Sequence, residues 1–353
     1  MYKKFFMGIA AIAALTLVSC SSEDLNSVSD NSSKNEAISF DGYLGRSAVS
    51  VNGSRASELK IADLQASKDG FGVFGNYNST GGQNFGFNLF NNVKVTYDAS
   101  AETKAWTYSP LKYWPTEGNI DFLAYAPRVD EKQLNGSSID FTVEGKAANQ
   151  KDLLWANAKG QTKQTISTTD NKVKFQFAHA LSRLGYTVKL KDAYSDATIK
   201  LKKITLAGSA DDATKKAFYT AGTIDLSKET KEADLWKIPT PATKQNFDWF
   251  SGDQKVTSTS ADNPKTDYLF VIPQDFSKTT PGADELYVIV EYTIQTGSTA
   301  IMVSKVYQKL DRKFDQGKAY TINLTIGLTP IEFNAEVTDW DTINGDIPVD
   351  SWE

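Results

Sequence analysis

The only cysteine of this 353-residue chain, Cys20, lies where a reactive thiol has a specific chemical use. Lys3 and Lys4 begin the chain, an apolar run covers residues 5–18, and small residues precede the cysteine. A charged start followed by a short apolar run is typical of a secretory signal, and the run is too short to span a bilayer. Residues 1–19 therefore resemble a bacterial lipoprotein signal peptide, after which a palmitate-type lipid anchor on a Cys20 thioether would hold the chain on a membrane.

Few other residues can carry catalysis or bind a metal. The chain contains one histidine, His179, and no second cysteine, so a zinc site of His and Cys residues is excluded and a Ser-His-Asp triad would have to use His179. Its apolar surroundings favour a buried, hydrogen-bonded structural residue. The 43 acidic residues single out no catalytic pair, and Asp211-Asp212 is typical of a solvated turn. We therefore expect no enzyme activity, no metal and no cofactor.

The charge balance also limits the partners. The formal net charge is −5, and no run of basic residues is interleaved with aromatic residues. Nucleic acid is therefore not an expected partner.

The elements that would position a functional site are short strands. Residues 20–36 are rich in Ser, Asn and acidic residues and predict a flexible tether. Beyond them, apolar and polar residues alternate with period two, broken by Gly, Asn, Asp and Pro. Strands without intervening helices pair mostly antiparallel and pack sheet on sheet. The sequence predicts an all-β protein with a β-sandwich at 37–171 and another at 172–353, divided after a polar stretch.

Two smaller expectations concern local structure. Helical periodicity is almost absent, and Phe177–Arg183 is the segment that could hold a helical turn or two. The segment Ser251–Lys265 is rich in Ser, Thr and Asp and predicts a loop.

A group of aromatic residues, Trp106, Tyr108, Tyr113 and Trp114, has two interpretations. Pro110 and Pro115 flank extended turns around it. The rings can pack the end of a sandwich, or they can form a platform on which a sugar stacks. We favour core packing, and the platform remains the alternative.

Several segments, in order, resemble the fimbrillin family of lipoprotein pilins, major and minor fimbrial subunits of Bacteroides-type bacteria. They are Phe71–Phe74, Trp106–Pro115, Phe122–Pro127, Asp152–Ala156, Phe177–Leu181, Gly317–Tyr320 and Val337–Trp340. The resemblance implies two tandem transthyretin-like antiparallel β-sandwiches and export as an outer membrane lipoprotein. It also implies assembly by strand exchange: a trypsin-like maturation protease cuts after an arginine, an N-terminal strand leaves, and the C-terminal segment of another subunit takes its place.

The N-terminal residues fit a removable strand and loop at 37–55. Ile38 and Phe40 are apolar, and the following Gly-containing stretch carries two arginines. Cleavage by a trypsin-like protease requires an extended, locally unfolded segment with a basic residue. Arg55 matches the cleavage position of the family best, and Arg46 is its rival. Either arginine can also be an ordinary solvated surface residue.

The C-terminal residues 329–353 contain a possible donor strand. Apolar residues at alternate positions give the segment one apolar face, and its expected contacts are Ile331, Phe333, Ala335, Val337 and Trp340. That face requires a groove, in which each large side chain contributes about 1.5–3 kcal/mol. The segment can be the last strand of its own domain or can be donated to a neighbouring subunit, and we favour donation because Gly327 and Pro330 interrupt the chain just before it.

The predicted function is that of a structural subunit of a cell-surface pilus that supports adhesion. Its expected partners are other pilus subunits in a homo- or heteropolymer, the maturation protease and the membrane that holds the lipid anchor. Two alternatives remain: a tip adhesin, which would accept a strand without donating one, and a cell-surface lipoprotein that binds glycans or proteins of host or bacterial surfaces.

Overall fold

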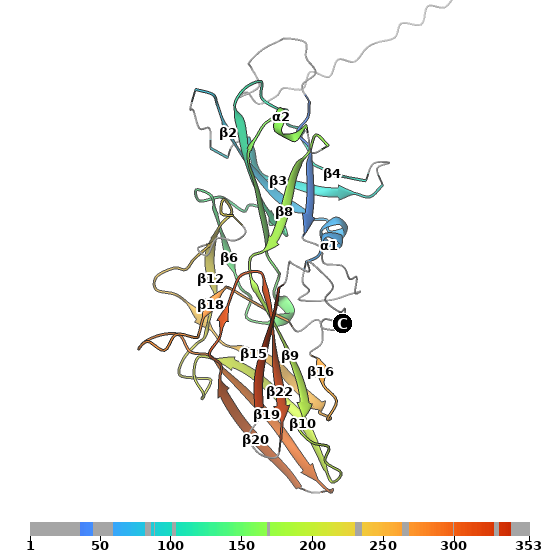
Figure 1. Cartoon of the computed structure of the whole chain (residues 1–353), viewed down its shortest axis with the longest axis vertical. Coiled ribbons are helices and arrows are strands. Elements are labelled where there is room, and N and C mark those ends of the chain that lie inside the picture. The colour runs from blue at the N-terminus through green and yellow to red at the C-terminus, as the bar shows by residue number, and fades with distance from the viewer. Residues whose placement is uncertain are drawn as a thin grey trace, which may run out of the picture. The chain divides into compact units, whose positions relative to one another are not determined.

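The computed structural model describes residues 36–44, 59–81, 86–87, 89–100, 104–167, 170–229, 235–262, 268–298, 300–327 and 332–339. Residues 37–353 form one compact unit, which is the part described below. Strands dominate it (Figure 1), so the predicted all-β fold is confirmed.

The first part of this unit is a seven-stranded sheet with the order β1-β8-β7-β5-β2-β3-β4. Its neighbours pair antiparallel except β1 and β8, which run parallel. The sheet extends to His179, past the division at residue 171 that the sequence predicts. Its strands are β1 (Phe40–Leu44), β2 (Phe71–Asn78), β3 (Phe90–Asp98), β4 (Ala105–Thr107), β5 (Asn119–Ala126), β7 (Leu154–Gln161) and β8 (Val173–His179).

Most of the remaining strands form two larger sheets. One has the order β16-β9-β22-β23, with β17 also pairing with β9, and the other has the order β15-β10-β19-β20. β9 and β22 run parallel. The strands are β9 (Ser182–Leu190), β10 (Ala197–Ala207), β15 (Phe247–Lys255), β16 (Ala261–Asp262), β17 (Leu269–Val271), β19 (Tyr287–Thr296), β20 (Ala300–Lys309), β22 (Lys318–Ile326) and β23 (Glu332–Asp339).

Short strands and helices complete the described part. A three-stranded sheet has the order β13-β12-β6, so a strand from the first half of the chain pairs with one from the second half. The short strands are β6 (Ser138–Thr142), β11 (Phe218–Tyr219), β12 (Ala221–Asp225), β13 (Trp236–Lys237), β14 (Lys244–Gln245), β18 (Gln274–Asp275) and β21 (Lys313–Phe314). The helices are α1 (Ile61–Ala66), α2 (Lys163–Ile166) and a 3₁₀ turn at Ala147–Asn149. α2 begins at Thr162, whose hydroxyl accepts a hydrogen bond from the backbone N–H of Thr165.

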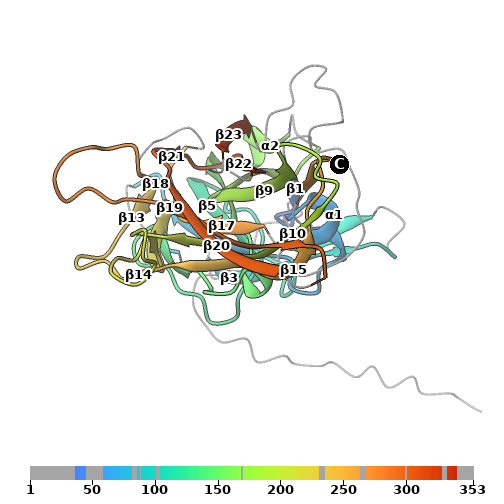
Figure 2. The same cartoon turned by 90° about the horizontal axis from the view of Figure 1, so that it is seen from below.

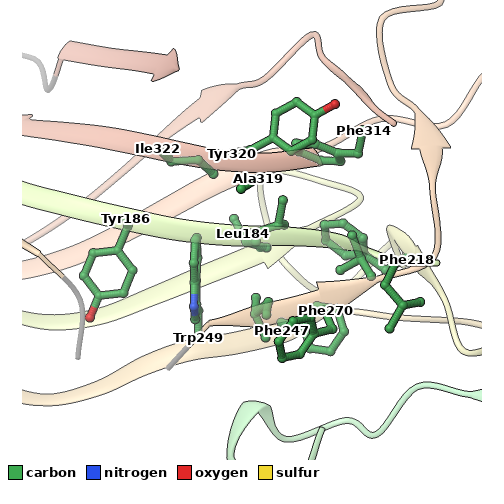
Figure 3. Packing of buried hydrophobic residues seen from close by; sticks show 14 of the residues in the cluster. Leu184, Tyr186, Phe218, Phe247, Trp249, Phe270, Phe314, Ala319, Tyr320 and Ile322 are labelled. Carbon is green, nitrogen blue, oxygen red and sulfur yellow. The ribbon is translucent and has the colours of Figure 1, made fainter. Parts of the chain in front are cut away.

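The larger core fills the space between the sheet that contains β9 and β22 and the sheet that contains β10 and β15 (Figures 2 and 3), and it continues to residues of the seven-stranded sheet such as Tyr125 and Trp155. Tyr186 of β9 meets Trp249 of β15 edge to face, with ring centroids 5.0 Å apart. Phe314 and Tyr320 form a second such pair at 4.8 Å. Alternate residues of β22 are buried, as the period-two pattern predicts. Two sheets that bury their facing sides in this way form a β-sandwich.

A separate core covers one face of the seven-stranded sheet. It contains Phe71, Phe122 and Phe175 together with Ile38 and Phe40 from the start of the unit. The first of the described strands, β1, is therefore part of a hydrophobic core as well as of the sheet.

Two local expectations are wrong. The segment Phe177–Arg183 contains no helical turn, because it holds the end of β8 and the start of β9. The predicted loop Ser251–Lys265 overlaps the end of β15, which pairs with β10 as far as Lys255. These residues are polar because β15 is an edge strand of its sheet, where side chains meet water on more than one side.

Candidate functional site

The strand β1 lies at the edge of the seven-stranded sheet. It pairs in parallel with β8, from Phe40 opposite Val173 to Leu44 opposite Phe177. Just before the strand, the N–H of Ile38 donates to the carbonyl of Lys112 at 2.8 Å, and the N–H of Val173 donates to the carbonyl of Ser39 at 2.8 Å. Backbone hydrogen bonds therefore hold this segment on both sides at its beginning.

The buried face of β1 fits into an aromatic pocket. The ring of Phe40 is surrounded by those of Phe90, Tyr108, Phe122 and Phe175, with centroid distances of 5.4, 5.4, 5.4 and 5.6 Å. Ile38, Phe40 and Leu44 are all buried. Each contributes roughly 1.5–3 kcal/mol by leaving water. We call the surroundings of this face, formed by Phe71, Phe90, Tyr108, Phe122, Phe175 and Phe177, the β1 site.

Gly42 marks the one narrow position on this face. A methyl group added at its Cα would lie 3.2 Å from Cε2 of Phe177 and 3.5 Å from Cε1 of Phe71. A methyl group is thus accommodated only if the Phe177 ring shifts by a few tenths of an ångström, and a larger side chain has no room. The β1 site therefore accepts large apolar side chains at positions 38, 40 and 44 of the strand and only a very small one at position 42.

Tyr108 ties the β1 site to the backbone of the strand. Its hydroxyl lies 2.8 Å from the carbonyl oxygen of Ile38, to which it donates. The same hydroxyl accepts a hydrogen bond from the backbone N–H of Lys112 at 3.2 Å. Burial raises the pKa of Tyr108, so its donor proton is retained. Sequence analysis grouped Tyr108 with its aromatic neighbours and did not identify this contact.

The other members of that aromatic group support the core-packing interpretation. Trp106 and Trp114 are buried in the same core as Phe40. Trp106 packs edge to face against Phe71, with centroids 4.9 Å apart. Tyr113 remains exposed, so the group presents no continuous platform of rings to solvent.

Three predicted site residues, Cys20, Arg46 and Arg55, lie outside the described residues. The described chain ends at Leu44 after β1 and resumes at Leu59. The backbone N–H of Leu59 donates to Oδ2 of Asp152 at 3.1 Å. The backbone at Leu59 is thus attached to a buried residue of the seven-stranded sheet's core.

Asp152, which holds the backbone of Leu59, also contacts His179. The predicted burial and hydrogen bonding of His179 are confirmed. Nδ1 of His179 lies 2.7 Å from Oδ2 of Asp152, and both side chains are completely buried. The antiparallel pairing of β7 and β8 places Leu154 opposite His179, which brings the neighbouring Asp152 within reach. Because the same carboxylate also holds the backbone N–H of Leu59, the pair has a structural role.

The expected donor segment forms β23 at the edge of its sheet. It pairs antiparallel with β22, with Phe333 opposite Leu324, Ala335 opposite Ile322 and Val337 opposite Tyr320. The side chain of Val337 is 45% exposed. Ile331 and Trp340 lie outside the described residues.

Acidic residues build no metal centre in the described part of the chain. No group of His, Cys, Asp and Glu there has the arrangement of a metal site. Asp211 accepts hydrogen bonds from the backbone N–H groups of Ala213 and Thr214, at 3.2 and 3.1 Å, and from nearby hydroxyls. These bonds, the hydroxyl of Ser209 foremost, lower the pKa of Asp211. The expectation of a solvated turn is thus confirmed.

Among the described residues, no helix has the length and apolar character needed to cross a membrane.

The same fold occurs in solved bacterial surface proteins. A fimbrial protein from Bacteroides vulgatus ATCC 8482 is 21% identical, with a TM-score of 0.62, and the match covers 86% of this chain and 99% of that one. A putative cell adhesion protein from Parabacteroides distasonis ATCC 8503 is 11% identical, with a TM-score of 0.50 and coverage of 88% and 97%. At these identities, the likeness shows a shared fold.

A search of curated proteins finds no match. The model of the fimbrillin-like family matches residues 54–340, which is most of the chain. The matched residues include every described strand from β2 to β23 and leave out β1. The protein therefore belongs to the fimbrillin-like family.

Proposed function

We propose that this chain is a structural subunit of a cell-surface fimbria, exported as a lipoprotein, activated by cleavage after an arginine and polymerised by exchange of β-strands. Membership of the fimbrillin-like family supports a fimbrial or adhesion role. Lipidation, cleavage and strand exchange are more specific proposals than this role, and each depends on particular residues of this chain.

The observation that carries the proposal is the construction of β1. An edge strand has a single neighbour in its sheet, here β8, so it can leave without breaking the sheet in two. Its inward side chains fill a site formed entirely by other parts of the chain. If cleavage after Arg55 or Arg46 releases β1, an apolar site is opened that requires another strand.

β23 supplies a strand of suitable type. It lies at the edge of its own sheet, close to the C-terminal end of the chain, and has β22 as its one neighbour. Donation of this strand to the opened site of another subunit would form a continuous polymer. A strand added to a sheet edge gains both backbone hydrogen bonds and side-chain burial.

The lipid anchor completes the proposal. Cys20 follows the signal-type segment at residues 1–19. Acylation there would keep the subunit at the outer membrane until a protease removes the anchor together with β1. Cleavage would thus release the subunit and open its strand-accepting site in the same step.

The glycan-binding alternative required exposed aromatic rings on which a sugar could stack. Trp106 and Trp114 are buried, and this disfavours it. A tip adhesin would need the β1 site but not β23. β23 has a single neighbour, β22, at the edge of its sheet, so it can be donated without dividing that sheet, and this supports a subunit that also donates.

Limited proteolysis tests the proposal. The lipidated chain is treated with trypsin, and the products are followed by mass spectrometry and by native gels. We expect an early cut after Arg55, followed by a ladder of oligomers, and we expect Arg55→Ala to block both. Arg46→Ala is the matched control and should change neither. Rapid cleavage without any oligomer would contradict assembly by strand exchange.

A further inference from the structure

The strand β20 is a long edge strand. It spans Ala300–Lys309 and pairs antiparallel with β19 along its whole length. Within the described part of the chain β19 is its only neighbour, and Figure 1 shows β20 at the outer side of its sheet. An edge strand presents unpaired N–H and C=O groups, and these form a template to which another strand can pair.

The side chains of β20 that point away from the core include exposed apolar groups. Val303 is 69% exposed and Tyr307 is 58% exposed, which makes them the two most exposed large apolar residues of the described chain. Both lie on the outer face of the sheet, because their partners on β19 alternate with the core residues Val290 and Tyr292. A second strand beside β20 would remove part of this apolar surface from water, which favours the association.

The lysines of β20 are already neutralised within the chain. Lysines on an edge strand normally oppose pairing with a further strand. Here Nζ of Lys305 lies 3.4 Å from Oδ2 of Asp212 and 3.6 Å from Oε1 of Glu291. Nζ of Lys309 lies 3.4 Å from Oε1 of Glu285. A partner strand therefore needs no acidic residues of its own, and a strand with the same charges as β20 is compatible with this edge.

The sequence of β20 is complementary to itself when it is read in the opposite direction. Residues directly opposite each other in an antiparallel pair lie on the same face, so a two-fold axis between two copies of β20 must pass through one residue of the strand. With the axis at Ser304, Ile301 lies opposite Tyr307 of the second copy, and Met302 lies opposite Val306. Apolar residues are thus paired with apolar residues on both faces.

Other positions of the axis are less favourable. An axis at Lys305 places this lysine directly opposite its own copy, where like charges are destabilising. An axis at Val303 or Val306 leaves a shorter ladder, because one end of each strand then extends past the end of the other. The axis at Ser304 pairs residues 300–308 of both copies and places Lys305 opposite Val303, which packs against the aliphatic part of the lysine.

We propose that two copies of this chain pair edge to edge through β20, antiparallel about a two-fold axis at Ser304. The sheets that contain β20 then form one continuous sheet across both copies. β20 belongs to a different sheet from β1 and from β23, so the contact leaves both strands of the proposed polymerisation free. The second copy is joined side by side, and this links a subunit of one fimbria to a subunit of a neighbouring fimbria.

A cysteine scan of the edge tests both the partner and the register. A residue on the two-fold axis lies opposite its own copy, and two cysteines there form a disulfide when their Cα atoms are about 4.4–6.8 Å apart. Val303→Cys, Ser304→Cys, Lys305→Cys and Val306→Cys each place a thiol on the axis of one register. The full, uncleaved chain is purified in mild detergent and oxidised gently, and the covalent dimer is quantified on non-reducing gels. The unmodified chain is the control for disulfides through Cys20.

We expect Ser304→Cys to give at least tenfold more covalent dimer than each of the other three variants. A higher yield from another position would overturn the axis at Ser304. Equal yields from all four, or dimers from none, would overturn edge pairing. The uncleaved chain retains β1, so strand exchange has no part in this experiment: its failure leaves the proposed function intact, and a failure to polymerise after cleavage leaves this inference intact.

A change of charge provides a second test. In the Ser304→Cys chain, Val303→Lys places a new lysine opposite Lys305 of the second copy, so the dimer yield should fall at least tenfold. Val129→Lys is the matched control, because Val129 is also an exposed valine but belongs to the loop after β5, and it should dimerise normally. Both variants replace exposed side chains and should keep the melting temperature of the parent chain. Equal dimer yields from these two folded variants would overturn the inference.

Discussion

His179 and Asp152 form a completely buried pair, with Nδ1 of the histidine 2.7 Å from Oδ2 of the aspartate. The same carboxylate oxygen accepts the backbone N–H of Leu59 at 3.1 Å, and the other oxygen accepts the N–H of Leu153 at 2.8 Å. One buried carboxylate thus joins the backbone at Leu59 to His179 of β8. The pair therefore anchors Leu59 to the sheet to which β1 belongs.

We predict that His179→Ala strongly destabilises the chain. The substitution removes a hydrogen-bond partner from a buried carboxylate, and this should lower the free energy of unfolding by about 3 kcal/mol. Lys174→Ala on the same strand removes a partly exposed side chain and should change stability by less than about 0.5 kcal/mol. Urea unfolding measures both values. Equal losses would show that the pair contributes little.

Phe40→Ala should weaken the attachment of β1. The ring contacts four aromatic neighbours, and its removal leaves a cavity that costs about 3–5 kcal/mol. Tyr43→Ala is the control on the same strand, because Tyr43 is exposed. Differential scanning calorimetry should show a clearly lower melting temperature only for Phe40→Ala. Similar melting curves for the two variants would contradict a tightly packed β1 site.

We predict that the buried Tyr320 makes the folded chain less stable in alkaline solution. Burial raises the pKa of Tyr320 from 10.0 to about 12. The folded state therefore retains this proton after the unfolded state has lost it, so the resulting stability is complete below pH 10 and declines as the pH rises toward 12. The slope of unfolding free energy against pH should be smaller in Tyr320→Phe. An unchanged slope between pH 10 and pH 12 would contradict the prediction.

The sequence predicted the parts of the fold that local patterns encode. Alternation identified inner strands such as β19 and β22, where one face is regularly buried. It failed at the polar end of β15, because an edge strand exposes residues that otherwise resemble a loop. It also missed α1, a six-residue helix in which Leu64 alone is buried. So short a helix depends on packing against the sheet more than on its own sequence.

The candidate site was predictable only in its outline. The apolar residues Ile38 and Phe40 indicated a strand, but β1 continues to Leu44 through residues that the sequence suggested were already a loop. The rings around Phe40 come from three other strands and from Tyr108, and their meeting depends on the whole sheet. Likewise, Asp152 and His179 meet only because β7 pairs with β8. Contacts between residues so far apart in the chain produce no periodic pattern of apolar residues by which the sequence could reveal them.

If Cys20 is lipidated, replacing it should change where the chain is found in the cell. Cys20→Ala should remove the acyl acceptor, so the chain should leave the membrane fraction or remain as an unprocessed precursor. Ser21→Ala, at the next residue, keeps the thiol and should fractionate normally. Radiolabelled palmitate followed by membrane fractionation measures both effects. Label in the Cys20→Ala chain would refute the assignment.

Truncation after Thr329 tests whether β23 belongs to its own sandwich or is donated. β22 retains β9 as its parallel partner when β23 is absent, and β23 lies at the edge of the sheet with Val337 45% exposed. We therefore expect a folded monomer with a melting temperature lowered by less than about 10 °C, as a loss of about 2 kcal/mol would produce.

The truncated chain should still accept a strand through its β1 site, so it should cap a growing fimbria without extending it. Truncation after Trp340 is the matched control, because it retains β23 and should both accept and donate. Size-exclusion chromatography after protease treatment separates capped from extended polymers. If truncation after Thr329 instead unfolds the sandwich of β9, β22 and β10, the strand is an internal element of its own domain, since an edge strand that is donated during assembly must be dispensable to the subunit that provides it.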